Sequence, residues 1–360
     1  MIAAQAYILR ATGKSPDLED IFVSDQLTKG QVRLRILYSG LCATQMEEIF
    51  VSSRNAEHMP HLFGHEAVGV IEQVGQGVIT KKIGDICVIH WRKSSIGLDS
   101  EPGAYFSKGA RIKSGKVVTF STNVVVPENR VSPLPREVPP HYGVLLGCSL
   151  TTGWGSVLKV GEFLPGESIL IIGLGAVGVF AALTAKKMGA RLVTGVDRKI
   201  STGQKSERIG LSRFHPSLEE YLTQNRPEDG HRAPDLVIDT SGDPKVIEEI
   251  ISWLPTSSRL VLVGMPRGKV NPKIDIQKML DGLKLAGSNG GGVDPGIDLQ
   301  AASGLLIEIR RAESPLEIKV MAADSLARAV KDFQTQGLLR FVLQMNSFPD
   351  YPHLPQQRSR

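Results

Sequence analysis

The segment Ile169–Gly178 reads ILIIGLGAVG, and it decides the fold expected for this chain. Its first part is a short β-branched run, which is typical of a buried strand. Gly173, Gly175 and Gly178 follow with the spacing G-x-G-x-x-G. In this pattern the first glycine permits a tight turn, the second lets the backbone approach a pyrophosphate, and the third lets a helix pack closely on the strand. The segment therefore predicts a strand, a glycine turn and a helix that bind a dinucleotide.

The residues after the glycine loop indicate which dinucleotide is bound. Free N–H groups at the start of the expected helix, around Ala176 and Val177, favour a phosphate. A second expected strand, LVTGV, ends before Asp197, which lies 19 residues past Gly178. A carboxylate there suits the ribose hydroxyls of NAD and repels the extra phosphate of NADP, whereas the neighbouring Arg198 keeps NADP open. The alternative interpretation is a tight strand–helix turn with an unrelated surface aspartate.

A membrane span is the other interpretation of this region. Ser168–Ala185 contains 18 residues without a charge, which is the threshold length for a membrane helix. The three glycines and the β-branched start favour a strand, a turn and a buried helix instead.

The composition of the regions around the glycine loop predicts a chain of two domains. Between 151 and 290, hydrophobic runs such as PDLVIDTSG and SRLVLVGMP alternate with helical stretches such as PKVIEEIISWL. This alternation predicts a doubly wound parallel sheet of the Rossmann type. Residues 1–150 contain short apolar runs separated by Gly, Pro, Asn and Asp, which predicts a β-rich domain. We expect residues 291–360 to return to that domain, with a loose tail after Ser347.

Overall composition excludes several classes of protein. The 360 residues are 41% hydrophobic and 22% charged, which argues against disorder and fibrous structure. The net charge of +5 is too mild to indicate nucleic-acid binding. Three cysteines, Cys42, Cys87 and Cys148, are too few for a disulfide framework, so we expect a reducing compartment. The N-terminus is a poor signal peptide, which makes a cytoplasmic location the expectation.

Three scattered residues suggest a metal site only when they are taken together. Cys42 or Cys148 alone is typical of a small buried hydrophobe, and His65 alone is typical of a satisfied histidine. The segment that starts at Gly64 reads GHEAVGVIEQVGQGV: Gly-His-Glu is followed after two residues by Gly69, after five more by Gly75 and after two more by Val78.

This signature, placed ahead of the glycine loop, resembles the zinc-dependent alcohol dehydrogenases of the medium-chain dehydrogenase/reductase family. The resemblance runs from about residue 25 to residue 345. It implies a GroES-like catalytic domain and one catalytic zinc held by Cys42, His65 and Cys148, with Glu66 as an auxiliary ligand. Two thiolates and an imidazole are ordinary zinc ligands, and three protein ligands leave a fourth position for water or substrate.

The resemblance also implies how protons and the hydride move. Zinc would stabilise the alkoxide of the substrate, which then gives a hydride to NAD. Thr44 would hydrogen-bond the substrate oxygen and pass its proton on. The family often has a histidine shortly downstream, where this chain has Glu47, so either Glu47 or water would complete the relay. Gln45 replaces an aspartate that braces the zinc histidine, and its carbonyl is expected to accept from His65 without the charge.

Further positions follow from the same resemblance. Arg340 matches an arginine that reaches the cofactor pyrophosphate, the alternative being a solvated charge at a strand edge. Trp91 falls near the lining of the substrate pocket, and the adjacent Arg92 and Lys93 either face an anionic polyol or are solvated charges. Many relatives hold a second, structural zinc with four cysteines, but the range Val88–Arg130 contains none, so one zinc per chain is predicted.

The expected function is oxidation of an alcohol by NAD, with zinc as cofactor. A secondary alcohol is favoured, such as a polyol, a sugar or a cyclitol. One alternative is a zinc-independent NAD(P)H quinone or enoyl reductase of the same fold, and another is a non-enzymatic dinucleotide-binding protein. The expected partners are the small substrate and a second copy of the chain, since relatives pair through the edge of the cofactor-domain sheet. A homodimer is expected, a tetramer is possible, and neither nucleic acid nor membrane is an expected partner.

Overall fold

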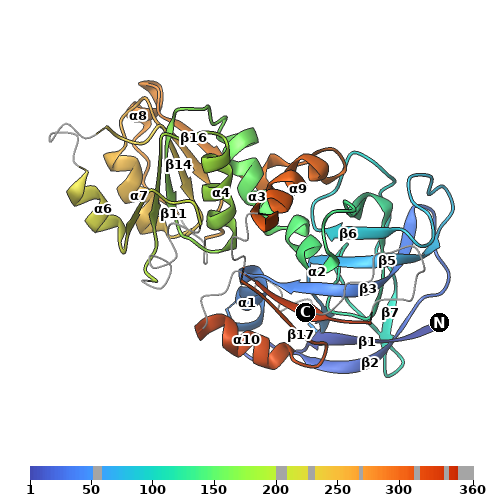
Figure 1. Cartoon of the computed structure of the whole chain (residues 1–360). Helices are drawn as coiled ribbons and strands as arrows, with labels where there is room; N and C mark the ends of the chain where they lie inside the picture. The colour runs from blue at the N-terminus through green and yellow to red at the C-terminus, as the bar shows by residue number, and fades with distance from the viewer. Residues whose placement is uncertain are drawn as a thin grey trace.

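The chain folds into two halves, which Figure 1 shows side by side. The computed structural model describes residues 1–51, 59–199, 209–225, 232–266, 271–311, 317–335 and 340–347. One half contains a parallel sheet, and the other contains two mainly antiparallel sheets. Helix α3 (Ser149–Gly155) lies where the halves meet. The predicted tail after Ser347 lies outside the described residues.

The first antiparallel sheet has five strands in the order β4-β1-β2-β7-β8. Its centre is a long hairpin, in which each residue from Ile2 to Ile8 pairs with one between Val23 and Asp17. One face of these strands is buried, because Ala6, Ile8 and Ile21 are almost inaccessible to solvent. The strands are β1 (Ile2–Leu9), β2 (Asp17–Val23), β4 (His61–Leu62), β7 (Tyr105–Ser107) and β8 (Ala110–Ile112).

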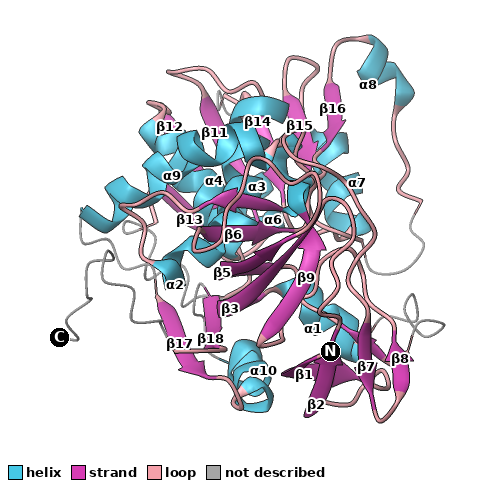
Figure 2. Cartoon of the chain, turned by 90° about the vertical axis from the view of Figure 1, so that its right-hand side faces the viewer, coloured by secondary structure: helices cyan, strands magenta, loops and turns pink. Residues whose placement is uncertain are grey.

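The second sheet carries most of the candidate site. Its order is β10-β6-β5-β3-β18-β17, and β9 pairs with β3 as well. Figure 2 shows β3, β5, β6 and β9 as neighbouring strands. The strands are β3 (Gln31–Leu41), β5 (Glu66–Val74), β6 (Ile86–His90), β9 (Asn123–Pro127), β10 (Val131–Pro133), β17 (Ile318–Ala322) and β18 (Arg340–Gln344). Because β18 pairs with β3, the end of the chain returns to its beginning.

The parallel sheet has the order β13-β12-β11-β14-β15-β16. The chain enters at the central strand β11, proceeds outward to β13 and crosses back to β14. This order is that of the Rossmann fold, which places ligands at the switch point beyond the carboxyl ends of the strands. The strands are β11 (Ser168–Ile172), β12 (Leu192–Val196), β13 (Arg213–His215), β14 (Leu236–Asp239), β15 (Arg259–Leu262) and β16 (Lys284–Gly287). The predicted α/β fold is confirmed.

Helices cover the sheets and connect the halves. The uncharged stretch Ser168–Ala185 divides into β11, the glycine turn and most of helix α4 (Ala176–Lys187). In the described part of the chain, no helix has the length and apolarity needed to cross a membrane. The remaining α-helices are α1 (Ala43–Phe50), α2 (Pro140–Gly143), α6 (Leu218–Gln224), α7 (Pro244–Trp253), α8 (Ile276–Leu280), α9 (Pro295–Arg311) and α10 (Leu326–Thr335).

Two glycines let helix α3 approach its neighbours closely. A Cβ atom at Gly153 would lie 2.5 Å from the carbonyl oxygen of Val177 in α4. A Cβ atom at Gly155 would lie 2.3 Å from the carbonyl oxygen of Gly291. Helix α3 is therefore in backbone contact with the helix that follows the glycine loop.

Candidate active site

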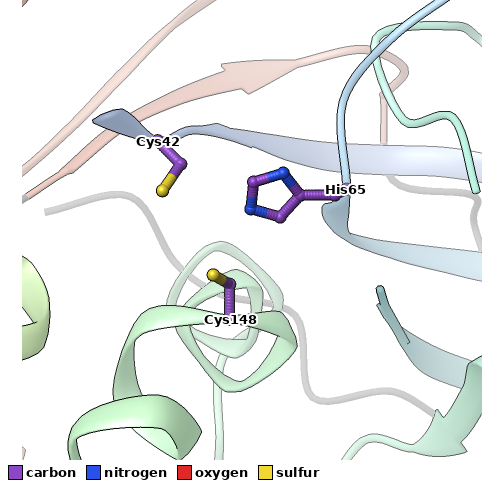
Figure 3. A group of neighbouring side chains, drawn as sticks. All are labelled: Cys42, His65 and Cys148. Carbon is purple, nitrogen blue, oxygen red and sulfur yellow. The ribbon is translucent and has the colours of Figure 1, made fainter. Parts of the chain in front are cut away.

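Three side chains from distant parts of the sequence converge in the antiparallel half. The sulfur atoms of Cys42 and Cys148 and a ring nitrogen of His65 all lie within 4.8 Å of one another. Figure 3 shows the ring of His65 with its Nε2 edge directed at the two sulfurs. Among the residues that the structure describes, this is the one such group of three with spacing suited to a metal ion.

Each of these residues is placed by a change in local structure. Cys42 follows β3 and caps helix α1 in an extended conformation, with φ −102° and ψ 160°. His65 follows Gly64, whose φ of +100° favours glycine, and a Cβ atom there would lie 2.4 Å from Thr119 Oγ1. Cys148 precedes the first residue of α3. Strand ends and a helix start thus bring together side chains that the sequence separates widely.

The donor set fits a zinc ion. His65 Nε2 is buried without a hydrogen-bond partner, and an unsatisfied buried nitrogen is costly. Cys42 is 8% exposed and Cys148 is 9% exposed, and none of the three cysteines forms a disulfide. Two thiolates and a neutral imidazole form a common zinc site with one open position. A metal ion between these three atoms would satisfy the buried nitrogen.

The electrostatics of the site favour a thiolate at Cys42. A hydrogen bond from the Cys148 thiol holds the pKa of Cys42 well below its usual value, and this outweighs the opposing effect of burial. The same hydrogen bond raises the pKa of Cys148. Burial lowers the pKa of His65, but the nearby Cys42 sulfur with its negative charge overcomes this effect, so that the pKa is raised.

Glu66 and Arg340 form a buried ion pair beside the cysteines. Arg340 Nε lies 3.1 Å from Glu66 Oε1, and Arg340 also donates to the carbonyl oxygen of Leu41 at 3.1 Å. The two side chains are 0% and 2% exposed respectively. Burial raises the pKa of Glu66 to about 7, although the charge of Arg340 opposes this. The alternative of a solvated strand-edge charge at Arg340 is wrong, while its contact with a cofactor phosphate stays a prediction.

Gln45 connects two of the three converging residues. Its Oε1 accepts a hydrogen bond from the backbone N–H of Cys42 at 3.0 Å. Its Nε2 lies 2.5 Å from Nδ1 of His65. The expected contact between Gln45 and His65 is present, but the amide nitrogen faces the ring where the carbonyl oxygen was expected.

Helix α1 presents the other polar side chains predicted near the metal. Thr44 is exposed, and its Oγ1 lies 3.9 Å from Cys42 Sγ. Glu47 is partly exposed on the same helix. Sequence reasoning missed a hydrogen bond of the same helix, in which Glu48 Oε1 lies 2.7 Å from Nε2 of His61. The spacing of four residues between Thr44 and Glu48 was the available signal, because it places them on one helix face.

The glycine loop has the geometry that its sequence predicts. Gly173 has φ +87°, and a Cβ atom there would lie 2.4 Å from Thr240 Oγ1. Gly175 has open space around its Cα, which suits the approach of a ligand. A Cβ atom at Gly178 would lie 1.9 Å from the carbonyl oxygen of Gly173, so the helix contacts the turn. The backbone of Ala176 and Val177 forms the first turn of α4.

Asp197 lies directly after β12 and contacts the glycine loop. Its Oδ2 accepts from the backbone N–H of Leu174 at 2.7 Å, and its Oδ1 accepts from that of Lys199 at 2.8 Å. Arg198 is exposed. The carboxylate therefore stands where strand β12 meets the glycine turn, and its contact with a ribose stays a prediction.

Trp91 and Arg92 connect the antiparallel half to the segment that follows the parallel sheet. Arg92 Nε donates to the carbonyl oxygen of Val293 at 2.8 Å, and Nη1 donates to that of Asn289. A Cβ atom at Gly290 would lie 2.7 Å from Cζ2 of Trp91. Arg92 is thus engaged by backbone carbonyls and does not act as a solvated charge, whereas Lys93 is exposed.

Comparisons with known proteins agree with this architecture. Residues 28–136 match the alcohol dehydrogenase GroES-like domain, and residues 176–306 match the zinc-binding dehydrogenase domain. The chain is 28% identical over 328 residues to Alcohol dehydrogenase-like 2 of Arabidopsis thaliana, covering 83% of this chain and 85% of that protein.

Solved structures share the whole fold. An alcohol dehydrogenase zinc-binding domain protein from Burkholderia ambifaria matches with a TM-score of 0.85 at 22% identity. Benzyl alcohol dehydrogenase from Acinetobacter calcoaceticus matches with a TM-score of 0.84 at 19% identity. Each match covers 96% of this chain and 100% of the other.

A GroES-like domain joined to a Rossmann domain defines a class of two-domain oxidoreductases. The chain belongs to the medium-chain dehydrogenase/reductase family, among its zinc-type alcohol dehydrogenases.

Proposed function

We propose that this protein is a zinc-dependent alcohol dehydrogenase that transfers a hydride between an alcohol and NAD. The observation that carries the proposal is the convergence of Cys42, His65 and Cys148, whose ligand atoms lie within 4.8 Å of one another. The zinc-independent reductases of this fold need no such group. Zinc held by these residues supplies a Lewis acid that favours the alkoxide form of the substrate.

Side chains of helix α1 would handle the proton of the substrate. Thr44 is exposed beside Cys42, so its hydroxyl can accept the proton of an alcohol and donate its own to the next group. Glu47, one turn further along α1, or water would receive it. Glu66, whose charge Arg340 balances, would serve as the auxiliary ligand.

The parallel half would bind the cofactor. Backbone N–H groups at Gly175, Ala176 and Val177, at the start of α4, would hold the pyrophosphate. Asp197 favours NAD over NADP in this proposal, because its carboxylate contacts the glycine loop and would repel the 2′-phosphate of NADP. Contact of Arg340 with the pyrophosphate, and use of Arg198 to admit NADP, are parts of the proposal that cofactor titration tests.

For the substrate we propose a secondary alcohol of the polyol, sugar or cyclitol kind, with Trp91 contributing to the pocket wall. An anionic group on the substrate is not part of the proposal, because Arg92 donates to backbone carbonyls. A panel that contains secondary polyols and primary aromatic alcohols, each offered with NAD and with NADP, decides the class.

The proposal is tested by metal analysis of the purified protein together with nicotinamide absorbance across the alcohol panel. We expect one zinc per chain and turnover with NAD, and loss of both in Cys42→Ser. Turnover without zinc would instead identify a quinone or enoyl reductase. Bound dinucleotide without turnover would identify a non-enzymatic protein. Cys87→Ser is the matched control, because Cys87 is buried in β6, and its thiol is kept protonated by a pKa that burial raises to about 12.

A further inference from the structure

We propose that Gln45 makes the Cys42, His65 and Cys148 group a weak and readily exchanging zinc site, because its carboxamide presents a donor where a zinc-bound histidine needs an acceptor. The inference rests on the proposed function and deepens it. It concerns metal affinity, so it can be measured without any substrate.

The orientation of the Gln45 carboxamide is fixed by the Cys42 backbone. A backbone N–H can only donate, so the Gln45 atom 3.0 Å from the nitrogen of Cys42 has to be the oxygen. The amide NH₂ is then the group that lies 2.5 Å from Nδ1 of His65. Gln45 is 1% exposed, so water cannot take the place of either contact.

This orientation fixes the tautomer that His65 adopts without metal. Nδ1 accepts a hydrogen bond from the amide, so a neutral ring carries its hydrogen on Nε2. Nε2 is the nitrogen that faces the two sulfurs in Figure 3, and it has no hydrogen-bond partner in the described residues.

Binding of zinc requires the other tautomer of the His65 ring. A neutral imidazole that ligates through Nε2 carries its hydrogen on Nδ1 and donates it to a partner. In this protein that N–H would meet the NH₂ of Gln45, and two donors would face each other. Turning the carboxamide over would satisfy His65, but it would bring the NH₂ against the N–H of Cys42. One donor stays unpaired in either arrangement, and the free energy of metal binding is reduced accordingly.

A carboxylate at this position removes the conflict. Gln45→Glu has nearly the same shape and replaces the NH₂ with an oxygen, so one side chain can accept from Cys42 N–H and from His65 Nδ1–H together. The partners of metal-binding histidines typically alter metal affinity by about 10- to 100-fold. We therefore expect Gln45→Glu to bind zinc on the order of 10- to 100-fold more tightly and to release it correspondingly more slowly.

The experiment measures the zinc dissociation constant and the rate of zinc release by competition with a chelator of known affinity. The full chain is used as wild type, Gln45→Glu, Gln73→Glu and Cys42→Ser. Gln73→Glu is the matched control, because it adds the same charge at the far end of β5 from Glu66, where Gln73 accepts from Arg33 Nη1 at 2.6 Å. Gln45→Asp is the second variant if Gln45→Glu fails to fold, and the shift in unfolding temperature on adding zinc then serves as the readout.

The outcomes separate the inference from the function on which it rests. Tighter binding in Gln45→Glu, with Gln73→Glu like the wild type, supports the inference even where the wild type loses zinc during purification. Equal affinity in the wild type and Gln45→Glu overturns it while leaving the zinc enzyme intact. Equal tightening in Gln73→Glu also overturns it, since charge alone would then be the cause. Failure of every variant to bind zinc removes the proposed function and the inference together.

Discussion

Arg340 and Glu66 show how one residue can depend on another that lies 274 positions away. Both are buried, and their charges face each other at 3.1 Å. Removal of Arg340 leaves the buried Glu66 carboxyl either charged without a partner or forced to take up a proton, at a cost of about 3–5 kcal/mol. We expect Arg340→Met to lower the free energy of unfolding by that amount. Urea denaturation measures it.

The double variant Glu66→Gln/Arg340→Met is the control for this prediction. It removes both charges, so we expect it to recover most of the lost stability. Equal stability of the single and double variants would show that the charges do not interact.

His90 predicts a dependence of stability on pH. Burial lowers its pKa to about 4 from an ordinary 6.5, and the ring hydrogen-bonds Ser132 Oγ at 3.0 Å. Between these values the unfolded chain binds a proton that the folded chain does not, so the free energy of unfolding falls as the pH falls. The neutral, buried His90 contributes about 3 kcal/mol to the free energy of unfolding. This contribution is fully present above the pKa of the unfolded chain and is lost as the pH falls through the pKa of the folded protein.

Replacement of His90 by Asn tests this prediction. Urea denaturation at about pH 7 and at about pH 5 gives, for each protein, the change in the free energy of unfolding with pH. The wild type should lose more stability than His90→Asn over this interval. Identical losses would assign the pH dependence to other groups.

At the scale of residues, sequence reasoning predicted which residues form the candidate site better than it predicted their contacts with one another. The Gly-His-Glu motif and two of the three cysteines indicated the group that the structure brings together. The partner of Arg340 was not predictable, because pairing of β18 with β3 is a tertiary event. The orientation of Gln45 was expected the wrong way round, since it depends on the N–H of Cys42 at the helix cap.

At the scale of elements, helix α3 depends on the absence of a side chain at Gly153. A Cβ atom there would meet the backbone of α4 at 2.5 Å, and a backbone contact does not move cheaply. We expect Gly153→Ala to lower the free energy of unfolding by about 1–3 kcal/mol through overpacking. Thermal or urea denaturation measures the change.

Gly304, in the middle of α9, provides the opposite case. No atom lies within 4 Å of the Cβ position at Gly304. Alanine favours a helix over glycine by about 1 kcal/mol, so Gly304→Ala should increase stability. If both substitutions changed stability in the same direction, close approach would not be the reason for Gly153.

Elements with strong local patterns were predictable, and those that depend on distant partners were less so. The β11 strand and the α4 helix follow directly from ILIIGLGAVG. The apolar run KVVTFSTNVVV (116–126) lies in the region where short apolar runs predict a β-rich domain, but only its end, from Asn123, belongs to a strand, Asn123–Pro127. The residues before it bond elsewhere, since the N–H groups of Thr119 and Phe120 donate to the carbonyl oxygen of Phe63. Tertiary contacts thus override the local preference.

At the scale of the whole molecule, strand β16 is the last strand of the parallel sheet, and no strand of the described residues pairs with its outer edge. Beside it, α8 exposes Ile276 and Leu280, which are 64% and 76% accessible to solvent. An open edge with exposed apolar side chains favours pairing with another chain. We predict a homodimer at this edge, which Leu280→Glu should shift to monomer in sedimentation. Ile79→Glu is the control, because Ile79 is 89% exposed in the other half, and it should leave the dimer intact.

The overall architecture was predictable because alternating strands and helices admit few topologies. The structure has the parallel sheet that this alternation predicts. The strand β17, which pairs in parallel with β18, had no clear signal, since its residues are only half-buried.

Cys148 lies next to helix α3, where the two halves of the molecule meet. Cys42 directly follows β3 and His65 directly precedes β5 in one half, whereas Cys148 precedes a helix whose Gly153 contacts helix α4 of the other half. Although this helix contacts the other half, the residue before Cys148 packs on the antiparallel half, because a Cβ atom at Gly147 would lie 2.5 Å from the carbonyl oxygen of Ile89 in β6. The three candidate ligands are therefore anchored in one half, and a rigid-body movement of the other half would leave their triangle unchanged.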